Sequence, residues 1–164
     1  MIRIERTFLI DKLPSDLAKH RKSEIEQGYF SDAIDGLRLR KKDNTYSLTR
    51  KIMGMPGDNS MREHIELPIY EEEFKLLWKA VTKKLTKTRY YYNEQLIGPE
   101  LRIDIFGGVL KGLVLVELIF SEQESAQDYT LPEWLGREIT TENWANNSNF
   151  ASKSYTELKK NIEI

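Results

Sequence analysis

The feature that most limits how this chain can fold is a repeated alternation of charged and apolar side chains. Residues 2–10 alternate in this way, and so do the segments Leu37–Arg40 and Lys87–Tyr90. A period of two residues is typical of a β-strand, whose successive side chains point to opposite faces. Such segments recur through most of the chain, so the sequence predicts a protein built mainly from short strands.

The predicted elements together indicate an α+β protein with mainly antiparallel strands. Turn residues such as Asp35-Gly36 and Asp43-Asn44 separate consecutive strand segments, which favours a barrel or a sandwich. Apolar residues recur at helical spacing from Tyr70 to about Lys83. The strands are expected at about residues 2–10, 24–30, 36–42, 45–53, 60–69, 85–95, 100–106 and 113–120, and further short helices at about 14–21, 122–128 and 142–150.

The composition excludes several kinds of site and partner. A length of 164 residues predicts one domain, and a net charge of −1 argues against non-specific binding to nucleic acid. The chain has no cysteine and only two histidines, which excludes disulfides, thiolate metal sites and a multi-histidine metal centre. No apolar run approaches the roughly 18 residues that span a membrane. MIRIERTFLI does not resemble a signal peptide, so we expect a cytoplasmic protein without membrane contact.

The charged positions inside the strands have two interpretations. They can lie in water while the opposite apolar faces pack under helices, which is the usual arrangement for an antiparallel sheet. Alternatively, they line a polar interior, where arginine forks match phosphate oxygens. Six strands repeat the pattern, and arginine is favoured among the charges. This repetition shifts the interpretation toward an interior that binds a polyphosphate-type anion.

Several short stretches are informative because of the order in which they occur. They are IRIERTFLI at 2–10, QGYF at 27–30, LRLR at 37–40, YSLTRK at 46–51, REHIE at 62–66, KTRYYY at 87–92, RIDIFGGVLKGLVLVELIF at 102–120 and LPEWLGREIT at 131–140, followed by Trp144 and Asn146. In this order they resemble the CYTH superfamily, also called the triphosphate tunnel metalloenzymes. That family includes class IV adenylyl cyclases, thiamine triphosphatases and inorganic triphosphatases. The resemblance implies a closed eight-stranded antiparallel barrel over about residues 2–150 of a single domain 1–164, with a tail at 151–164.

The resemblance also implies a site inside this barrel. Carboxylates would hold Mg²⁺ or Mn²⁺, and basic residues would hold a small-molecule polyphosphate or a nucleoside triphosphate. A homodimer is compatible with such barrels. By position, the catalytic residues would be Glu5, Asp104 and Glu117, and the metal ligands Glu5, Glu66, Asp104 and Glu117. The phosphate-binding residues would be Arg38, Arg40, Lys51, Arg62, Lys87 and Arg89, to which Arg3 adds a further charge.

The chain departs from the family pattern at positions that concern the metal. The family opens with two glutamates and a lysine at alternate positions, where this chain has Arg3, Glu5 and Thr7. His64 and Ile119 also stand where the family has carboxylates. Arg3 would replace part of the charge of a metal ion without its Lewis acidity, so loss of the metal is one expectation. The other is retention, because Mg²⁺ commonly needs only one or two protein carboxylates.

The sequence therefore leaves functions of different classes open. The first hypothesis is a phosphohydrolase that acts on inorganic or organic triphosphate. The alternative is a non-catalytic or altered module that binds polyphosphate or nucleotide without metal chemistry. A third interpretation is a structural domain with solvated strand faces. Adenylyl cyclase activity ranks below hydrolysis, because no adenine pocket is evident and the metal site that cyclisation would need is impaired. Tyr90–Tyr92 could stack on a nucleobase, but they are expected to pack on the strands.

Overall fold

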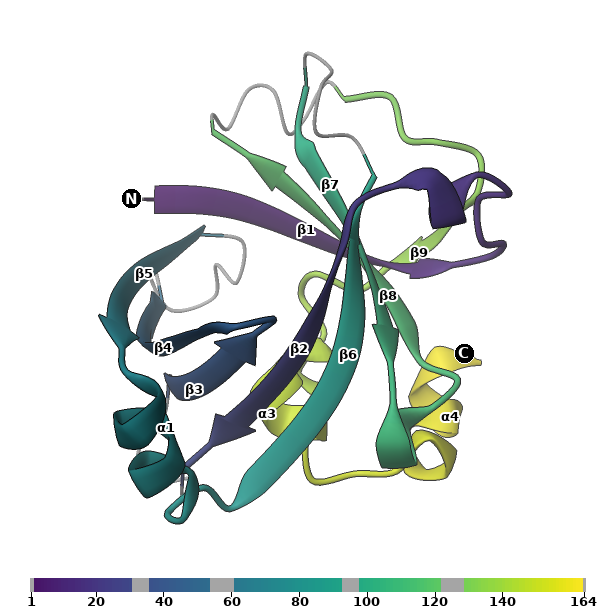
Figure 1. Cartoon of the computed structure of the whole chain (residues 1–164). Helices are drawn as coiled ribbons and strands as arrows, with labels where there is room; N and C mark the ends of the chain where they lie inside the picture. Colours follow the sequence, from purple (N-terminus) through teal and green to yellow (C-terminus); the bar gives the residue numbers. More distant parts are fainter. Residues whose placement is uncertain (1, 31–35, 54–60, 93–97, 122–128, 164) are drawn as a thin grey trace.

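In the computed structural model, nine β-strands of the described residues form one antiparallel sheet (Figure 1). The model describes residues 2–30, 36–53, 61–92, 98–121 and 129–163, and only the backbone of residues 2–3, 51–53 and 61–64. The predicted α+β fold with mainly antiparallel strands is thus confirmed. The strands are β1 Ile2–Ile10, β2 Lys22–Tyr29, β3 Leu37–Lys42, β4 Thr45–Met53, β5 Met61–Ile69, β6 Lys83–Tyr91, β7 Glu100–Phe106, β8 Val114–Phe120 and β9 Leu135–Glu138.

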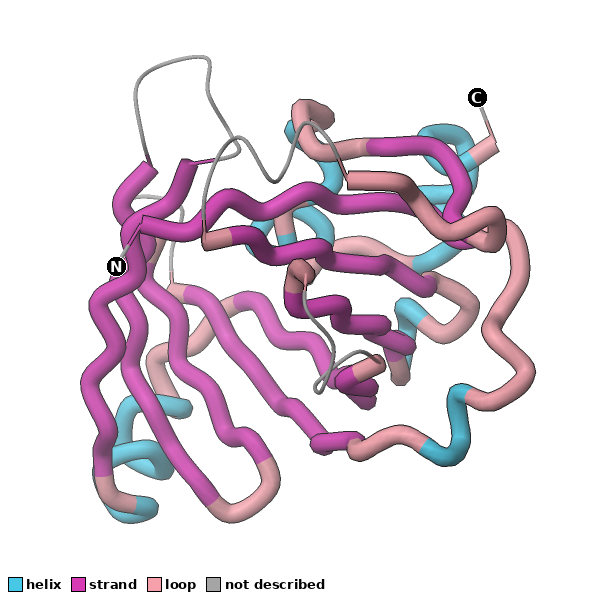
Figure 2. Tube along the Cα trace, turned by 90° about the horizontal axis from the view of Figure 1, so that it is seen from above, coloured by secondary structure: helices cyan, strands magenta, loops and turns pink. Residues whose placement is uncertain are grey.

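The sheet is strongly curved, and the start of β1 also pairs with the start of β5. The strand order is β5-β4-β3-β2-β6-β7-β8-β1-β9. In addition, Ile2–Ile4 of β1 pair with Met61–Glu63 of β5. The start of β1, the eighth strand in this order, therefore lies beside the start of β5, the first. Figure 2 shows the strands following a curved path rather than a flat layer.

The ninth strand differs from the sequence prediction of eight. The last predicted strand was 113–120, but Leu135–Glu138 form a further strand that pairs with the end of β1. The backbone N–H of Ile139 also donates to the carbonyl of Thr7 at 2.8 Å. A four-residue strand contains too few alternating positions to produce a recognisable period. The neighbouring helix expected at 122–128 lies outside the described residues.

The helix α1, Glu71–Trp78, packs on the outer face of β3 and β4. Three glutamates occupy its first turn, where they oppose the positive end of the helix dipole. Its buried Phe74 forms a core cluster with Leu39 of β3 and with Val81. The helix is shorter than the predicted 70–83, because Lys83 already belongs to β6.

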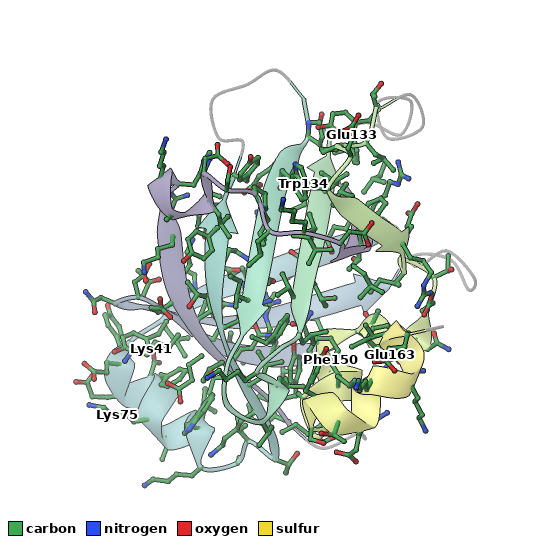
Figure 3. The ribbon with its side chains drawn as sticks, turned by 90° about the vertical axis from the view of Figure 1, so that its right-hand side faces the viewer. Lys41, Lys75, Glu133, Trp134, Phe150 and Glu163 are labelled. Atoms are coloured by element: carbon green, nitrogen blue, oxygen red, sulfur yellow. The ribbon has the colours of Figure 1, made fainter. Side chains whose placement is uncertain are left out.

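The C-terminal segment packs against one end of the sheet. It contains η3 Asn143–Ala145, α3 Asn147–Phe150 and α4 Tyr155–Ile162, so the predicted helix at 142–150 is interrupted at Asn146. Phe150 is fully buried, with its ring 5.2 Å from that of Phe106 (Figure 3). Leu158 of α4 is also fully buried in the same cluster. The remaining short helices are η1 Leu17–Lys19 and η2 Gly108–Leu110.

None of the helices in the described ranges has the length and apolar character that a membrane crossing requires.

Candidate functional site

A cavity of about 560 Å³ lies on the concave side of the sheet. Residues from eight strands line it, and Asn147 of α3 joins them. The lining contains seven basic and four acidic described side chains. A cavity with this balance is suited to a ligand that carries several negative charges.

The alternating pattern of the strands places these basic residues inside. Arg38, Arg40 and Lys42 share one face of β3, and all three line the cavity. Between them, Leu39 points outward and is fully buried beneath α1. The sheet thus reverses the common arrangement, because its concave face is polar and its convex face packs against apolar cover.

Arg38 and Arg40 face the cavity without a carboxylate partner among the described residues. Arg38 is 5% exposed; its Nη2 donates to Thr49 Oγ1 at 3.2 Å, and its Nε has no partner in the described part of the chain. Arg40 donates from Nε and Nη2 to Oε1 of Gln27, at 3.2 and 2.7 Å. Burial lowers the pKa of both guanidiniums, and the nearby charges of Arg38 and Arg89 help to lower that of Arg40 to about 9. Both remain positively charged at neutral pH.

The other basic pair of the cavity is tied into a buried ionic network. Lys87 Nζ lies 2.5 Å from Asp104 Oδ2, and Arg89 binds both oxygens of Asp104 at 2.7 Å. Arg89 Nη2 also donates to Glu117 Oε2 at 2.8 Å. Burial opposes the ionisation of Asp104, but the charges of Arg89 and Lys87 outweigh it and lower its pKa. Burial lowers the pKa of Lys87 to about 8, although Asp104 pulls it upward.

The network extends to two residues that the sequence analysis did not assign to the site, Gln27 and Asn147. Asn147 Oδ1 accepts from Lys87 Nζ at 3.2 Å and from Gln27 Nε2 at 3.3 Å. Gln27 is fully buried and also donates to the hydroxyl of Tyr29 at 2.7 Å. Gln27 lies in the QGYF stretch and Asn147 follows Asn146, so both lie in or beside segments that carried the family resemblance.

The predicted carboxylates occupy different positions around the cavity. Glu5, which is 7% exposed, lines the cavity together with Glu66 and Glu117. Asp104 is 1% exposed, and both of its oxygens are bonded to Lys87 and Arg89. The side chains of Arg3, Lys51, Arg62 and His64 lie outside the described residues. Their backbones are neighbours in the sheet, because Arg3 is paired with Arg62 and Lys51 with His64.

The described residues suit a weakly coordinated metal ion better than a closed metal centre. Within the described ranges, no group of three histidine or carboxylate side chains is close enough to hold an ion. Asp104 is engaged by Lys87 and Arg89, and Arg89 also pairs with Glu117. Glu5 and Glu66 also line the cavity and carry carboxylate oxygens of the kind that bind divalent ions. This set fits Mg²⁺ or a similar ion that takes one or two carboxylates and completes its shell with water and phosphate oxygens.

The three consecutive tyrosines near the cavity are engaged by other residues. Tyr90 and Tyr92 pack against the core cluster below β7 and β8. The ring of Tyr92 lies 4.4 Å from His20 and 5.5 Å from Trp134. Tyr91 lines the cavity, but the guanidinium of Arg21 lies 3.7 Å from its ring centre. These contacts agree with the expectation that the tyrosines pack on the strands.

The chain is similar in structure and in sequence to proteins named inorganic triphosphatase. A crystal structure of an inorganic triphosphatase superposes on 92% of this chain and 95% of its own, with a TM-score of 0.67 and 29% sequence identity. An inorganic triphosphatase of Nitrosomonas europaea is 33% identical over 143 residues, which are 85% of this chain and 90% of that protein. A second, from Acetivibrio thermocellus, is 28% identical over 82% of this chain and 83% of its own length. No family model matches the chain.

The mainly antiparallel fold and the basic cavity agree with the resemblance to the triphosphate tunnel proteins, whereas closure of the barrel is not established. The chain therefore belongs to the CYTH superfamily and, within it, to the family of the inorganic triphosphatases.

Proposed function

We propose that this protein hydrolyses inorganic triphosphate inside its basic cavity, and that β1–β5 pairing closes eight strands into a tunnel around it. The observation that carries the proposal is the pair Arg38 and Arg40, which are turned into the cavity without a carboxylate partner among the described residues. Buried cations of this kind are costly unless an anion compensates them. A chain of phosphate groups would supply that charge through paired guanidinium–oxygen contacts.

The cavity residues have different roles in the proposed hydrolysis. Arg38, Arg40, Lys87 and Arg89 would hold the phosphate oxygens and stabilise the charge that develops on them. The oxygen of a water molecule attacks the terminal phosphorus, and the bond from that phosphorus to its bridging oxygen breaks. Orthophosphate and pyrophosphate are the products. Glu5 lines the cavity and is nearly buried, so its carboxylate is placed to accept the proton that the water releases.

Asp104 has a positioning role in this proposal. Its oxygens are bonded to Lys87 and Arg89, so it orients two of the phosphate-binding cations rather than contacting substrate. Lys51, Arg62 and Arg3 are proposed to add further phosphate contacts from β4, β5 and β1.

A divalent ion, Mg²⁺ or Mn²⁺, fits the carboxylates that line the cavity. Glu5 and Glu66 would hold it, with Glu117 as a third ligand when Arg89 binds substrate. When bound, such an ion would neutralise charge on the phosphate oxygens during phosphoryl transfer.

The relatives named inorganic triphosphatase favour this enzyme over a module that only binds polyphosphate. We also propose that residues 1–164 act as a single domain, because Leu158 in the tail and Phe150 belong to one core cluster with the strands.

Release of orthophosphate from inorganic triphosphate tests the proposal, with Mg²⁺, with Mn²⁺ and with EDTA. We expect metal-dependent release by the wild-type protein. Arg38→Ala and Arg40→Ala should each lower kcat/KM by roughly 100-fold, the scale of losing a charged group that binds the reacting phosphates. Arg50→Ala on β4 is the control, because Arg50 is exposed and does not line the cavity.

Wild-type protein that releases no phosphate with either metal would contradict the proposal. So would equal activity of the Arg38, Arg40 and Arg50 variants.

A further inference from the structure

We infer that Gln27 is a positioning residue for the substrate, because its uncharged amide holds the guanidinium of Arg40 at the cavity and leaves the positive charge of Arg40 to the bound anion. The inference rests on the proposed function, because it concerns the same cavity. It gives a physical reason for an amide at a position where a carboxylate would hold a buried arginine more firmly.

The orientation of the Gln27 amide is fixed by its neighbours. A guanidinium can only donate hydrogen bonds, so the amide oxygen must face Arg40. Oε1 of Gln27 accepts from Nε and Nη2 of Arg40 at 3.2 and 2.7 Å. The NH₂ group of Gln27 donates to the hydroxyl of Tyr29 at 2.7 Å and to Asn147 Oδ1 at 3.3 Å. Asn147 Oδ1 is fixed in the same way, because it also accepts from the ammonium of Lys87.

Gln27 lies behind the cavity wall rather than on it. It is fully buried and does not line the cavity, whereas Arg40 does. A substrate in the cavity would therefore contact Arg40 and not Gln27. The effect of Gln27 on the substrate must pass through the guanidinium that it holds.

The two cation pairs of the cavity are held by partners of different charge. Lys87 and Arg89 are bonded to the carboxylate of Asp104, which compensates part of their charge. Among the described residues, Arg38 and Arg40 donate instead to a hydroxyl and to an amide. Neutral acceptors fix the direction of a guanidinium without neutralising it. The charge of this second pair is therefore left for an anion.

The charged groups that act most strongly on Arg40 are cations. Burial is the main cause that lowers the pKa of Arg40 to about 9, and the charges of Arg38 and Arg89 lower it further. Tyr29 and Glu117 raise this pKa, but each has a smaller effect than either arginine. The protein therefore does not neutralise Arg40 from other directions, which makes the lack of charge on Gln27 decisive.

Two substitutions separate the charge at position 27 from the position of Arg40. Gln27→Glu keeps the shape of the side chain and adds a negative charge beside Arg40. Gln27→Met keeps the length and removes the acceptor without adding charge. The control for the first is Asn143→Asp, the same amide-to-carboxylate change at an exposed residue that does not line the cavity.

Calorimetric titration with inorganic triphosphate in EDTA gives Kd for the whole protein without the proposed metal-dependent hydrolysis. We expect Gln27→Glu to raise Kd roughly tenfold at low salt, because the new carboxylate pairs with Arg40 in place of the substrate. The same pair compensates a buried cation in the ligand-free protein, so the midpoint of urea denaturation should not fall. Asn143→Asp should leave Kd unchanged. Unchanged affinity in Gln27→Glu would overturn the inference.

A second comparison tests whether Gln27 acts through Arg40. We expect Gln27→Met to raise Kd roughly fivefold, because the guanidinium loses its fixed direction and must be ordered by the substrate. In protein that already carries Arg40→Met, the same substitution should change Kd less than about twofold. Equal fold-changes in the two backgrounds would show that Gln27 acts on the fold in general, and would overturn the positioning role.

Failure of the proposed function gives a different result. Wild-type protein that binds triphosphate but releases no phosphate with Mg²⁺ or Mn²⁺ would contradict the hydrolysis, and the Kd comparison would still test Gln27. Wild-type protein that hydrolyses triphosphate, together with Gln27 variants that bind it equally well, would support the hydrolysis and overturn the positioning role.

Discussion

At the scale of single residues, Asp104 connects the stability of the protein with its binding site. This carboxylate is almost completely buried and compensates two buried cations, Lys87 and Arg89. Removing one partner from a buried ionic cluster leaves the others without compensation in a medium of low polarity. The cluster is therefore expected to respond much more strongly to substitution than an ion pair on the surface.

Asp104→Asn should lower the free energy of unfolding by about 3–5 kcal/mol, because it keeps the shape of the side chain but removes its charge. Urea denaturation measures the change. Glu138→Gln is the control, since it breaks the Arg6–Glu138 pair, whose side chains are 20% and 38% exposed, and should cost at most about 1 kcal/mol. Similar losses of unfolding free energy for the two variants would show that the Asp104 cluster contributes no more to stability than a surface ion pair does.

The lowered pKa of Lys87 predicts an alkaline limit to activity. Since its pKa is about 8, the ammonium loses its proton in the folded protein before most other lysines do. We expect kcat/KM for triphosphate to fall as the pH rises through about 8. In Lys87→Arg the guanidinium stays charged, and the decline should move to higher pH. A wild-type profile that stays flat to pH 9.5 would contradict this assignment.

Loss of the Lys87 proton is expected to affect stability in the opposite direction to activity. Between about pH 8 and the ordinary lysine value of 10.5, the unfolded chain binds the proton of Lys87 more tightly than the folded chain does. The contribution of this group to stability therefore rises with pH across that window. A decline in activity near pH 8 is thus not expected to reflect unfolding caused by Lys87.

At the scale of elements, Gly28 sets how closely β2 approaches the segment that follows α1. A Cβ atom at this position would lie 2.4 Å from Val81 Cγ1 and 2.8 Å from Trp78 Cζ3. Neither distance is compatible with van der Waals contact. The glycine is needed here for space, since its backbone is that of an ordinary strand residue.

Gly28→Ala should destabilise the protein by about 1–3 kcal/mol, the usual cost of overpacking a core. Val81→Ala in the same chain should recover part of that loss, because it removes the closest of the clashing atoms. A double-mutant cycle measured by urea denaturation tests this coupling. Strictly additive effects of the two substitutions on the free energy of unfolding would exclude the clash with Val81 as the cause of the destabilisation.

The elements also show what local patterns can predict. All eight predicted strands occur, and β1, β4 and β7 match their predicted bounds, because alternation over seven to nine residues is a strong signal. The short β9 and the break in the helix at Asn146 were missed, because tertiary contacts decide both. The shared face of Arg38 and Arg40 followed from the period of two, and the repetition of the pattern over six strands favoured its inward direction. The engagement of Asp104 did not, because it depends on the register that places Arg89 opposite it.

At the scale of the whole molecule, charge is distributed unevenly between the interior and the surface. The chain has a net charge of −1, yet seven basic and four acidic described side chains line the cavity. The acidic excess must therefore lie elsewhere on the molecule. The attraction for a polyanion is local, which explains why the overall charge argues against nucleic-acid binding while the cavity favours phosphate.

The hydrogen bond from Lys87 to Asn147 has a consequence for how the cavity is emptied. Lys87 lines the cavity together with Arg38, Arg40 and Arg89, so the same basic residues face substrate and products. A product that stays bound to these residues delays the next substrate molecule. Inhibition by pyrophosphate that competes with substrate is thus expected of a cavity whose cations bind both.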